Sequence, residues 1–300
     1  MTQANRIVDL SAFRELFEKV TFWRARDRAE LIEQSIYFTL ASVLGIIFFF
    51  PFYWLLKVAI SWPPANLYSG QPSLGIENLS YYNFVEVFFA IPFPQFLMNS
   101  LIIVSMAIGA NLIFNSLAAY ALTMDFHGKR GVQLLLITAM MIPFQTTIIP
   151  AFLVTNRLGL VNTHLGIVLP LATIIINILI LVASFEAVPD SILESARLDG
   201  ASELYILFGV YWPLSKAALA TNVILSFVFS WNAFLWPLIV VRDQAMEPLP
   251  LALANFQSQF QGNFALTYAF SIMVVLPLVV MFLLLQRQFI ESVVMTSVKE

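Results

Sequence analysis

Residues 165–201 read LGIVLPLATIIINILILVASFEAVPDSILESARLDGA, an apolar run that passes directly into a short charged segment. The run itself, 165–184, contains no acid or base and has the length of a helix that crosses a bilayer, about 20 residues. The following segment carries four acids and one arginine before it reaches a glycine. This sequence therefore alternates between lipid-embedded helices and at least one element that faces water.

The composition of the whole chain supports a membrane protein. Of its 300 residues, 60% are hydrophobic and only 11% are charged, whereas soluble domains carry roughly 25% charged residues. The small net charge of −3 argues against a nucleic-acid partner. The chain has no cysteine, which excludes disulfides and thiolate metal sites.

These features predict an all-α membrane protein with six transmembrane helices. An amphipathic segment, 1–34, precedes them, because apolar residues recur there at helical spacing. The transmembrane domain covers 35–290 and a short tail covers 291–300. The six uncharged stretches long enough to cross the bilayer are 37–57, 96–124, 132–155, 165–184, 217–241 and 264–285.

The basic residues set the orientation of these spans. With a cytoplasmic N-terminus, twelve of the fifteen Lys and Arg residues fall on the cytoplasmic side, and only Lys57, Arg157 and Arg242 fall outside. This bias is a clear positive-inside signal. An even number of spans returns the C-terminus to the cytoplasm and places the charged segment between the fourth and fifth spans there as well.

That cytoplasmic element, about 186–216, is predicted to be a short helix followed by two hinges. Pro189 and Asp190 favour a helix start, Gly200 favours a left-handed stop, and Ser202 favours a new start. Pro213 should break the second helix. The residues expected to give the first helix an apolar side are Ile192, Leu193, Ala196 and Leu198. Such a rod, parallel to the membrane, could dock on a partner, although an ordinary loop helix fits the pattern equally well.

The same element carries a family likeness. Glu194-Ser195-Ala196, with Gly200 and a later break at Pro213, resembles the EAA motif of permease subunits of bacterial ABC importers. Ser195 replaces the usual alanine, and Asp199-Gly200-Ala201 has the form typical of carbohydrate importers. The likeness extends over about 40–300, and the chain resembles the MalG-like subunits of the maltose and glycerol-3-phosphate group. Further segments that resemble this family are Asn99-Ser100-Leu101, Met141-Ile142-Pro143, Trp231-Asn232 and the tail from Gln286-Arg287 to Lys299.

The resemblance implies a heteromeric complex in the inner (cytoplasmic) membrane of a bacterium. A second homologous permease would complete the pathway, and an extracytoplasmic solute-binding protein would deliver a sugar, oligosaccharide, polyol or glycerophosphate-type solute. Two ATP-binding cassette subunits would bind ATP and Mg²⁺. The residues implied to couple this chain to them are Glu194, Ser195, Ala196, Asp199, Gly200 and Pro213, with weaker tail contacts from Arg287 and Lys299.

The sequence contains no recognisable nucleotide-binding or catalytic motif. It has no Gly-x-x-x-x-Gly-Lys-[Ser/Thr] loop for nucleotide phosphates, so we expect no enzyme activity and no cofactor in this subunit. Its two histidines, His127 and His164, fall on opposite sides of the predicted membrane and should not share a metal. No acid or base lies in the middle of a span, which disfavours the alternative of an ion-coupled secondary carrier. A channel subunit is the other alternative.

Polar residues in the fifth span are candidate contacts for a hydroxylated solute. They are Asn222, Ser226, Ser230 and Asn232. The first three are four residues apart and therefore share one face of a helix. Hydrogen bonds between helices are the alternative role for each of them.

Overall fold

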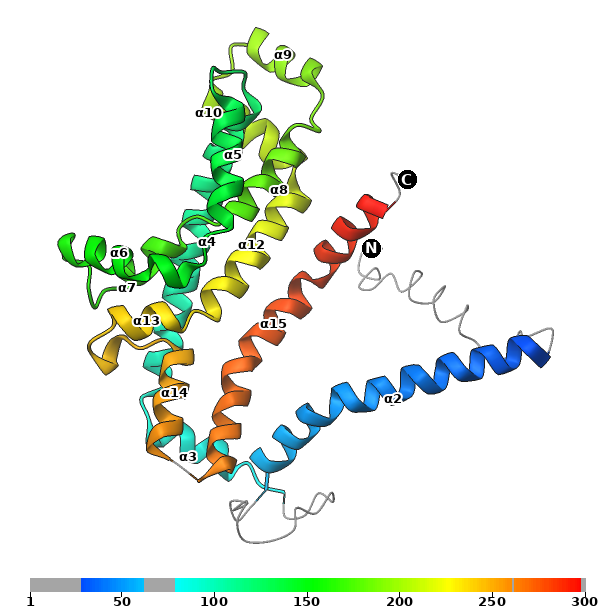
Figure 1. Cartoon of the computed structure of the whole chain (residues 1–300), viewed down its shortest axis with the longest axis vertical. Helices are drawn as coiled ribbons and strands as arrows, with labels where there is room; N and C mark the ends of the chain where they lie inside the picture. The colour runs from blue at the N-terminus through cyan, green and yellow to red at the C-terminus, as the bar shows by residue number, and fades with distance from the viewer. Residues whose placement is uncertain (1–27, 62–78, 261, 298–300) are drawn as a thin grey trace, which may run out of the picture. The chain divides into compact units, whose positions relative to one another are not determined.

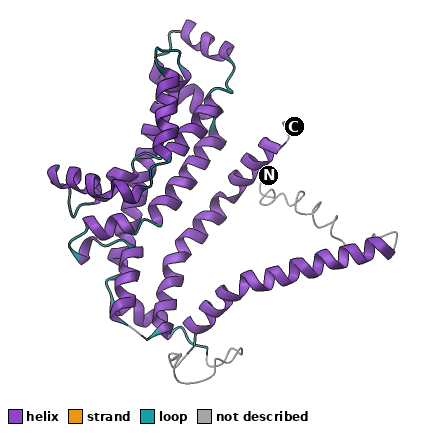
Figure 2. Cartoon of the chain, in the orientation of Figure 1, coloured by secondary structure: helices purple, strands orange, loops and turns teal. Residues whose placement is uncertain are grey.

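The structure, a computed structural model, describes residues 28–61, 79–260 and 262–297, and the described residues form helices joined by loops and turns (Figure 2). The chain divides into two compact units, Met1–Lys57 and Val58–Glu300. The amphipathic helix predicted for 1–34 lies mostly outside the described residues, since these begin at residue 28.

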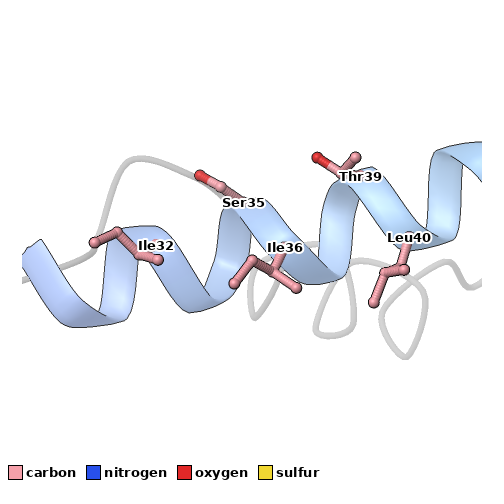
Figure 3. Close-up of a pocket in the computed structure, with 5 residues that line it drawn as sticks. All are labelled: Ile32, Ser35, Ile36, Thr39 and Leu40. Atoms are coloured by element: carbon pink, nitrogen blue, oxygen red, sulfur yellow. The ribbon is translucent and has the colours of Figure 1, made fainter.

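Within the first unit, the residues that the structure describes belong to α2 (Arg28–Ala59). Its stretch Gln34–Ala59 is long and apolar enough to cross a membrane, as predicted for 37–57. A shallow hollow on α2 is lined by Ile32, Ser35, Ile36, Thr39 and Leu40 (Figure 3). None of these five side chains can ionise, and Ser35 and Thr39 are the two that carry a hydroxyl group.

Helix α4 (Phe93–Thr123) is central to the second unit. It packs most extensively on α8 (Ile175–Phe185) and α12 (Lys216–Trp231), and α12 packs in turn on α15 (Phe264–Ser297) (Figure 1). The buried residues of α4 are largely small or amide-bearing and include Asn99, Ser100, Ala107, Asn111, Asn115, Ser116 and Ala119. Small residues let helix backbones approach closely, and buried amides join helices by hydrogen bonds.

The predicted third span, 132–155, is broken in two. Helix α5 (Lys129–Met140) and helix α6 (Phe144–Arg157) meet at a bend of 103°. Pro143 causes the break, because its backbone is extended (φ −61°, ψ 135°) and a proline disfavours helical geometry in the residue before it.

The fourth span, predicted as 165–184, is also bent. Helix α7 (His164–Val168) continues into the short 3₁₀ helix η1 (Leu169–Leu171), and this piece meets α8 at 53°. Pro170 lies within η1, where it provides no backbone donor to extend the helix.

The fifth span does not follow its predicted limits, 217–241. Helix α12 ends at Trp231, and a separate helix α13 (Leu235–Val240) follows the turn at Asn232. On its other side, α12 meets the helical stretch Glu203–Leu214 at 90°. By length and composition the described residues hold three unbroken helices able to cross a membrane, or up to six if each bent pair forms one span.

Shorter helices lie at the two ends of the second unit. Helix α9 (Asp190–Leu198) lies at one end, and α3 (Tyr82–Ala90) and α14 (Leu249–Gln259) lie at the other (Figure 1). A loop with the short helix η3 (Gln244–Met246) joins α13 to α14.

Candidate functional site

Helix α9 has the boundaries that its sequence predicts. It begins after Pro189, carries Asp190 in its first turn and Arg197 in its last, and is followed by Gly200 at φ +82°. The chain turns back as the backbone N–H of Ala201 donates to the carbonyl of Ala196 at 3.0 Å. A Cβ atom at Gly200 would meet nothing within 4 Å. Glycine is therefore needed for the left-handed backbone and not for lack of room in this chain.

Only part of the predicted apolar side of α9 packs inward. Leu193 is buried, and Ala196 packs against the same cluster as Phe185 and Tyr211. Leu198, by contrast, is 88% exposed and Ile192 is also exposed. Leu198 follows Ala196 by two residues, about 200° around a helix, and so faces the other way.

Exposed apolar side chains also occur in the segment that follows α9. Leu198 is accompanied by Leu204 and Tyr205, which are both 62% exposed. The motif residues Glu194, Ser195 and Asp199 are exposed as well, which makes the element available to a partner. We call Leu198, Leu204 and Tyr205, together with Glu194, Ser195 and Asp199, the docking face.

The segment after Gly200 contains a widened turn. Ser202 caps α10 (Glu203–Tyr205) by accepting a hydrogen bond from the backbone N–H of Tyr205 at 3.2 Å, as predicted. A π-helix, η2 (Ile206–Tyr211), follows, and α11 (Trp212–Leu214) contains Pro213. The bend itself falls at Ser215 (φ −107°, ψ 28°), two residues beyond the predicted hinge. The wider turn accommodates Pro213, which has no backbone N–H to donate to the preceding turn.

A polar network joins α9 to the central helix. The hydroxyl of Tyr120, on α4, donates a hydrogen bond to the carboxylate of Glu203, and Arg197 Nε lies 3.6 Å from the other oxygen of that carboxylate. Nothing in the sequence alone predicts this role for Tyr120. Tyr120 and Glu203 are 83 residues apart, and no local pattern in the sequence connects them.

A hollow of about 370 Å³ opens beside α9. Its walls include the carboxylates of Asp125, Glu186 and Asp190 together with Arg197. Lys129 Nζ lies 3.9 Å from Glu186 Oε1. This end of the second unit therefore combines acidic, basic and apolar side chains around one short helix.

The candidate pathway residues divide into two groups. Asn222 and Ser226 are buried and accept hydrogen bonds from Asn177 Nδ2 of α8 at 3.2 and 3.1 Å, and the Ser230 hydroxyl donates to the carbonyl of Ser226. Asn232 lies elsewhere, exposed beyond the end of α12, where it donates to the Val228 carbonyl at 2.8 Å. In this chain alone, the first group faces a neighbouring helix. Their role toward a solute stays a prediction.

Of the two predicted tail residues, one lies within a described helix. Arg287 belongs to α15, and Lys299 lies outside the described residues. Among the residues that the structure describes, no three His, Asp or Glu side chains gather to hold a metal ion.

A second polar cluster occupies the opposite end of the bundle. Asn99 Nδ2 donates to the carbonyls of Ala245 and Glu247 at 2.8 and 3.0 Å, and Asn99 Oδ1 lies 3.0 Å from His164 Nε2. Asn162 Oδ1 accepts from the backbone N–H of Arg242 at 2.9 Å. These bonds tie the loop before α14 to the starts of α4 and α7.

Comparisons with known proteins agree with this arrangement. Residues 116–290 match the family described as "Binding-protein-dependent transport system inner membrane component". Over 262 residues, the chain is 31% identical to the arabinooligosaccharides transport system permease protein AraQ of Bacillus subtilis, covering 86% of this chain and 92% of that protein. Over 278 residues it is 28% identical to the trehalose/maltose transport system permease protein MalG of Thermococcus litoralis, covering 91% and 99%.

A solved structure is similar over most of the chain. It is that of a bacterial ABC transporter involved in the import of the acidic polysaccharide alginate. The TM-score is 0.77 and the identity is 25%, and the match covers 88% of this chain and 98% of the chain in that structure.

Proposed function

The chain belongs to the family of binding-protein-dependent transport system inner membrane components, and from that premise we propose that it spans the membrane as one of two homologous permease subunits in a bacterial ABC importer. The resemblance drawn from Glu194, Ser195, Ala196 and Gly200 is thus confirmed at the level of the family. The proposed solute is a sugar, oligosaccharide, polyol or glycerophosphate, because the relatives are named for sugar transport.

The exposed helix α9 carries the proposal. It leaves Glu194, Ser195 and Asp199 accessible beside the apolar Leu198, while the sequence has no nucleotide-binding loop. In an ABC importer, a permease without its own ATPase needs a surface that receives work from an ATPase subunit. We therefore assign the docking face to one of two ATP-binding cassette subunits, which would supply ATP and Mg²⁺. Ala196, Gly200 and Pro213 would shape it, and the tail from Arg287 to Lys299 would add contacts.

The proposed topology places α9 in the cytoplasm. Six spans, three of them broken, would leave both termini on the cytoplasmic side of the bacterial inner membrane, in accord with the distribution of Lys and Arg. The loop of 242–248 would then face outward, where an extracytoplasmic solute-binding protein approaches. Within this topology, residues 1–34 form the N-terminal segment, 35–290 the transmembrane domain and 291–300 the tail.

Reconstitution tests the proposal. The chain, its partner permease, the ATPase and the binding protein are placed in proteoliposomes, with the binding protein outside and ATP inside. We expect solute uptake and ATP hydrolysis that both depend on the binding protein. Uptake driven by an ion gradient without ATP would favour a secondary carrier instead. The ligand retained by the purified binding protein identifies the solute.

A further inference from the structure

Helix α4 connects the two ends of the second unit without a break. It has 31 residues, or about 46 Å at 1.5 Å per residue, which exceeds the roughly 30 Å hydrocarbon thickness of a bilayer. Each end of this helix is hydrogen-bonded to a different segment of the chain.

At one end, α4 is bonded to the segment that leaves α9. Tyr120 donates to Glu203, and Glu203 pairs with Arg197 of α9 at 3.6 Å. One turn along α4, the hydroxyl of Ser116 accepts a hydrogen bond from Trp212 Nε1 at 3.1 Å. A displacement of α9 therefore reaches α4 through side chains on both sides of η2.

At the other end, α4 holds the loop before α14. Asn99 donates to two carbonyls of this loop, those of Ala245 and Glu247. Ser100 Oγ accepts from the backbone N–H of Leu249 at 2.8 Å. Both side chains are buried, so the loop follows the start of α4.

The covalent route from α9 to α12 is less direct. It passes the left-handed Gly200, the widened turn η2 and the 90° bend at Ser215. Each of these interruptions can absorb motion by changing backbone angles. Helix α4 has no such interruption between Phe93 and Thr123.

We propose that α4 transmits movement of α9 to the outer loop 242–248, and that Tyr120 is the positioning residue that couples the two. The inference rests on the proposed function, in which an ATPase moves α9 and a solute-binding protein approaches the outer loop. It assigns the main link to the bond between Tyr120 and Glu203, because Glu203 also pairs with Arg197 of α9, whereas Trp212 lies beyond η2. When ATP draws α9 toward the ATPase, Glu203 pulls Tyr120, and Asn99 shifts the loop.

The absence of cysteine from the chain allows a direct test. Gln244→Cys places a single thiol on the outer loop, where residue 244 is exposed. The complete complex in proteoliposomes is labelled with a membrane-impermeant maleimide, without nucleotide and after trapping with ATP and vanadate. We expect the labelling rate to change by about fivefold or more, the lower range of typical coupling between sites.

Tyr120→Phe removes one hydroxyl and should abolish most of that change, while ATPase subunits still co-purify with the complex. Glu203→Ala should act in the same way, and the double variant should lose no more than either single one, because both break the same link. The matched control is Tyr81→Phe, which removes a hydroxyl from a side chain that is 78% exposed.

Two results would overturn the inference. One is wild-type labelling behaviour in both Tyr120→Phe and Glu203→Ala. The other is an active complex whose Gln244→Cys thiol reacts equally fast with and without trapped nucleotide. A complex in which the binding protein fails to stimulate ATP hydrolysis would instead refute the proposed function, and the inference with it.

Discussion

The indole N–H of Trp212 donates a hydrogen bond to the hydroxyl of Ser116, although 96 residues separate the two in the chain. Ser116 is completely buried on α4, and Trp212 lies directly after the widened turn η2. The bond therefore holds the chain against the central helix just before the 90° bend at Ser215.

Ser116→Ala should lower the stability of the purified protein. The substitution leaves the Trp212 N–H without its acceptor, and we expect a loss of about 1 kcal/mol. Denaturant unfolding in detergent measures the change. Ser258→Ala is the control, because that exposed hydroxyl donates to the Asn255 carbonyl of its own helix, and it should change stability by less.

Gly200→Val should uncouple transport from ATP hydrolysis while expression is retained. The backbone of residue 200 has φ +82°, a conformation that costs an L-residue roughly 1–2 kcal/mol and is worse for a β-branched side chain. Gly200→Asn should be milder, since asparagine tolerates this region. Solute uptake and ATPase activity are measured together. Gly131→Ala, where the new Cβ meets nothing within 4 Å, serves as the control, and wild-type uptake in Gly200→Val would contradict the prediction.

Gly166→Ala should destabilise the turn before α7. A Cβ there would collide with the backbone carbonyl of Leu160 and lie 3.3 Å from Thr155 Cγ2, so the backbone must move. The carbonyl of Gly166 also accepts the indole N–H of Trp236 at 3.0 Å, and movement would weaken that bond. Thermal unfolding should show a lower midpoint. The same change at Gly109 in α4 meets nothing within 4 Å and should not destabilise, since alanine favours a helix over glycine by about 1 kcal/mol.

Glu194→Lys should weaken binding of the ATPase subunit. The side chain is exposed on the docking face. Reversal of its charge should disturb the electrostatic complementarity between this face and the ATPase subunit. Co-purification of the ATPase with the tagged permease measures the loss. Glu86→Lys makes the same charge change on α3, at the opposite end of the bundle (Figure 1). An equal loss in both variants would show that the effect is not specific to the docking face.

Glu247 should make stability depend on pH. Burial raises the pKa of its carboxyl group, against the opposing effect of a hydrogen bond from Asn255 at 2.8 Å. The folded state then binds the proton more tightly than the unfolded state. Its contribution to stability is complete below the unfolded pKa, about 4.3, and is lost as the pH rises through the folded value.

Glu247→Gln removes that titration. The variant should therefore gain stability over wild type at neutral pH and match it more closely at acidic pH, as measured by unfolding midpoints across the range. Glu86→Gln is the control. Parallel pH profiles of stability for Glu247→Gln and wild type would show that titration of this carboxyl group does not affect stability.

Local rules predicted the helix boundaries around the candidate site well, because these depend on neighbouring residues. Pro189, Gly200 and Ser202 mark the start of α9, its left-handed stop and the next cap in the structure. Pro213 was less informative, because the π-turn before it moves the bend to Ser215. The broken spans had a visible signal in Pro143 and Pro170, but hydropathy averaged over a window does not register a single proline.

Contacts between distant segments were beyond these rules. The face shared by Asn222 and Ser226 follows from helical spacing, but its partner, Asn177, depends on how α8 packs against α12. The bond between Tyr120 and Glu203 likewise exists only because α4 ends beside α10. Bundle geometry, which no segment specifies alone, decides both.

The widened turn of η2 has a mechanical consequence. The N–H of Trp212 reaches back five residues to the carbonyl of Leu207, whereas an α-helix spans four, so the turn stores one surplus residue. Releasing that residue into regular α-helix would lengthen the segment by about 1.5 Å and swivel whatever follows by about 100°. The six residues of η2 can therefore change both the length and the rotation of this segment, which a uniform α-helix cannot do without losing its hydrogen-bond pattern.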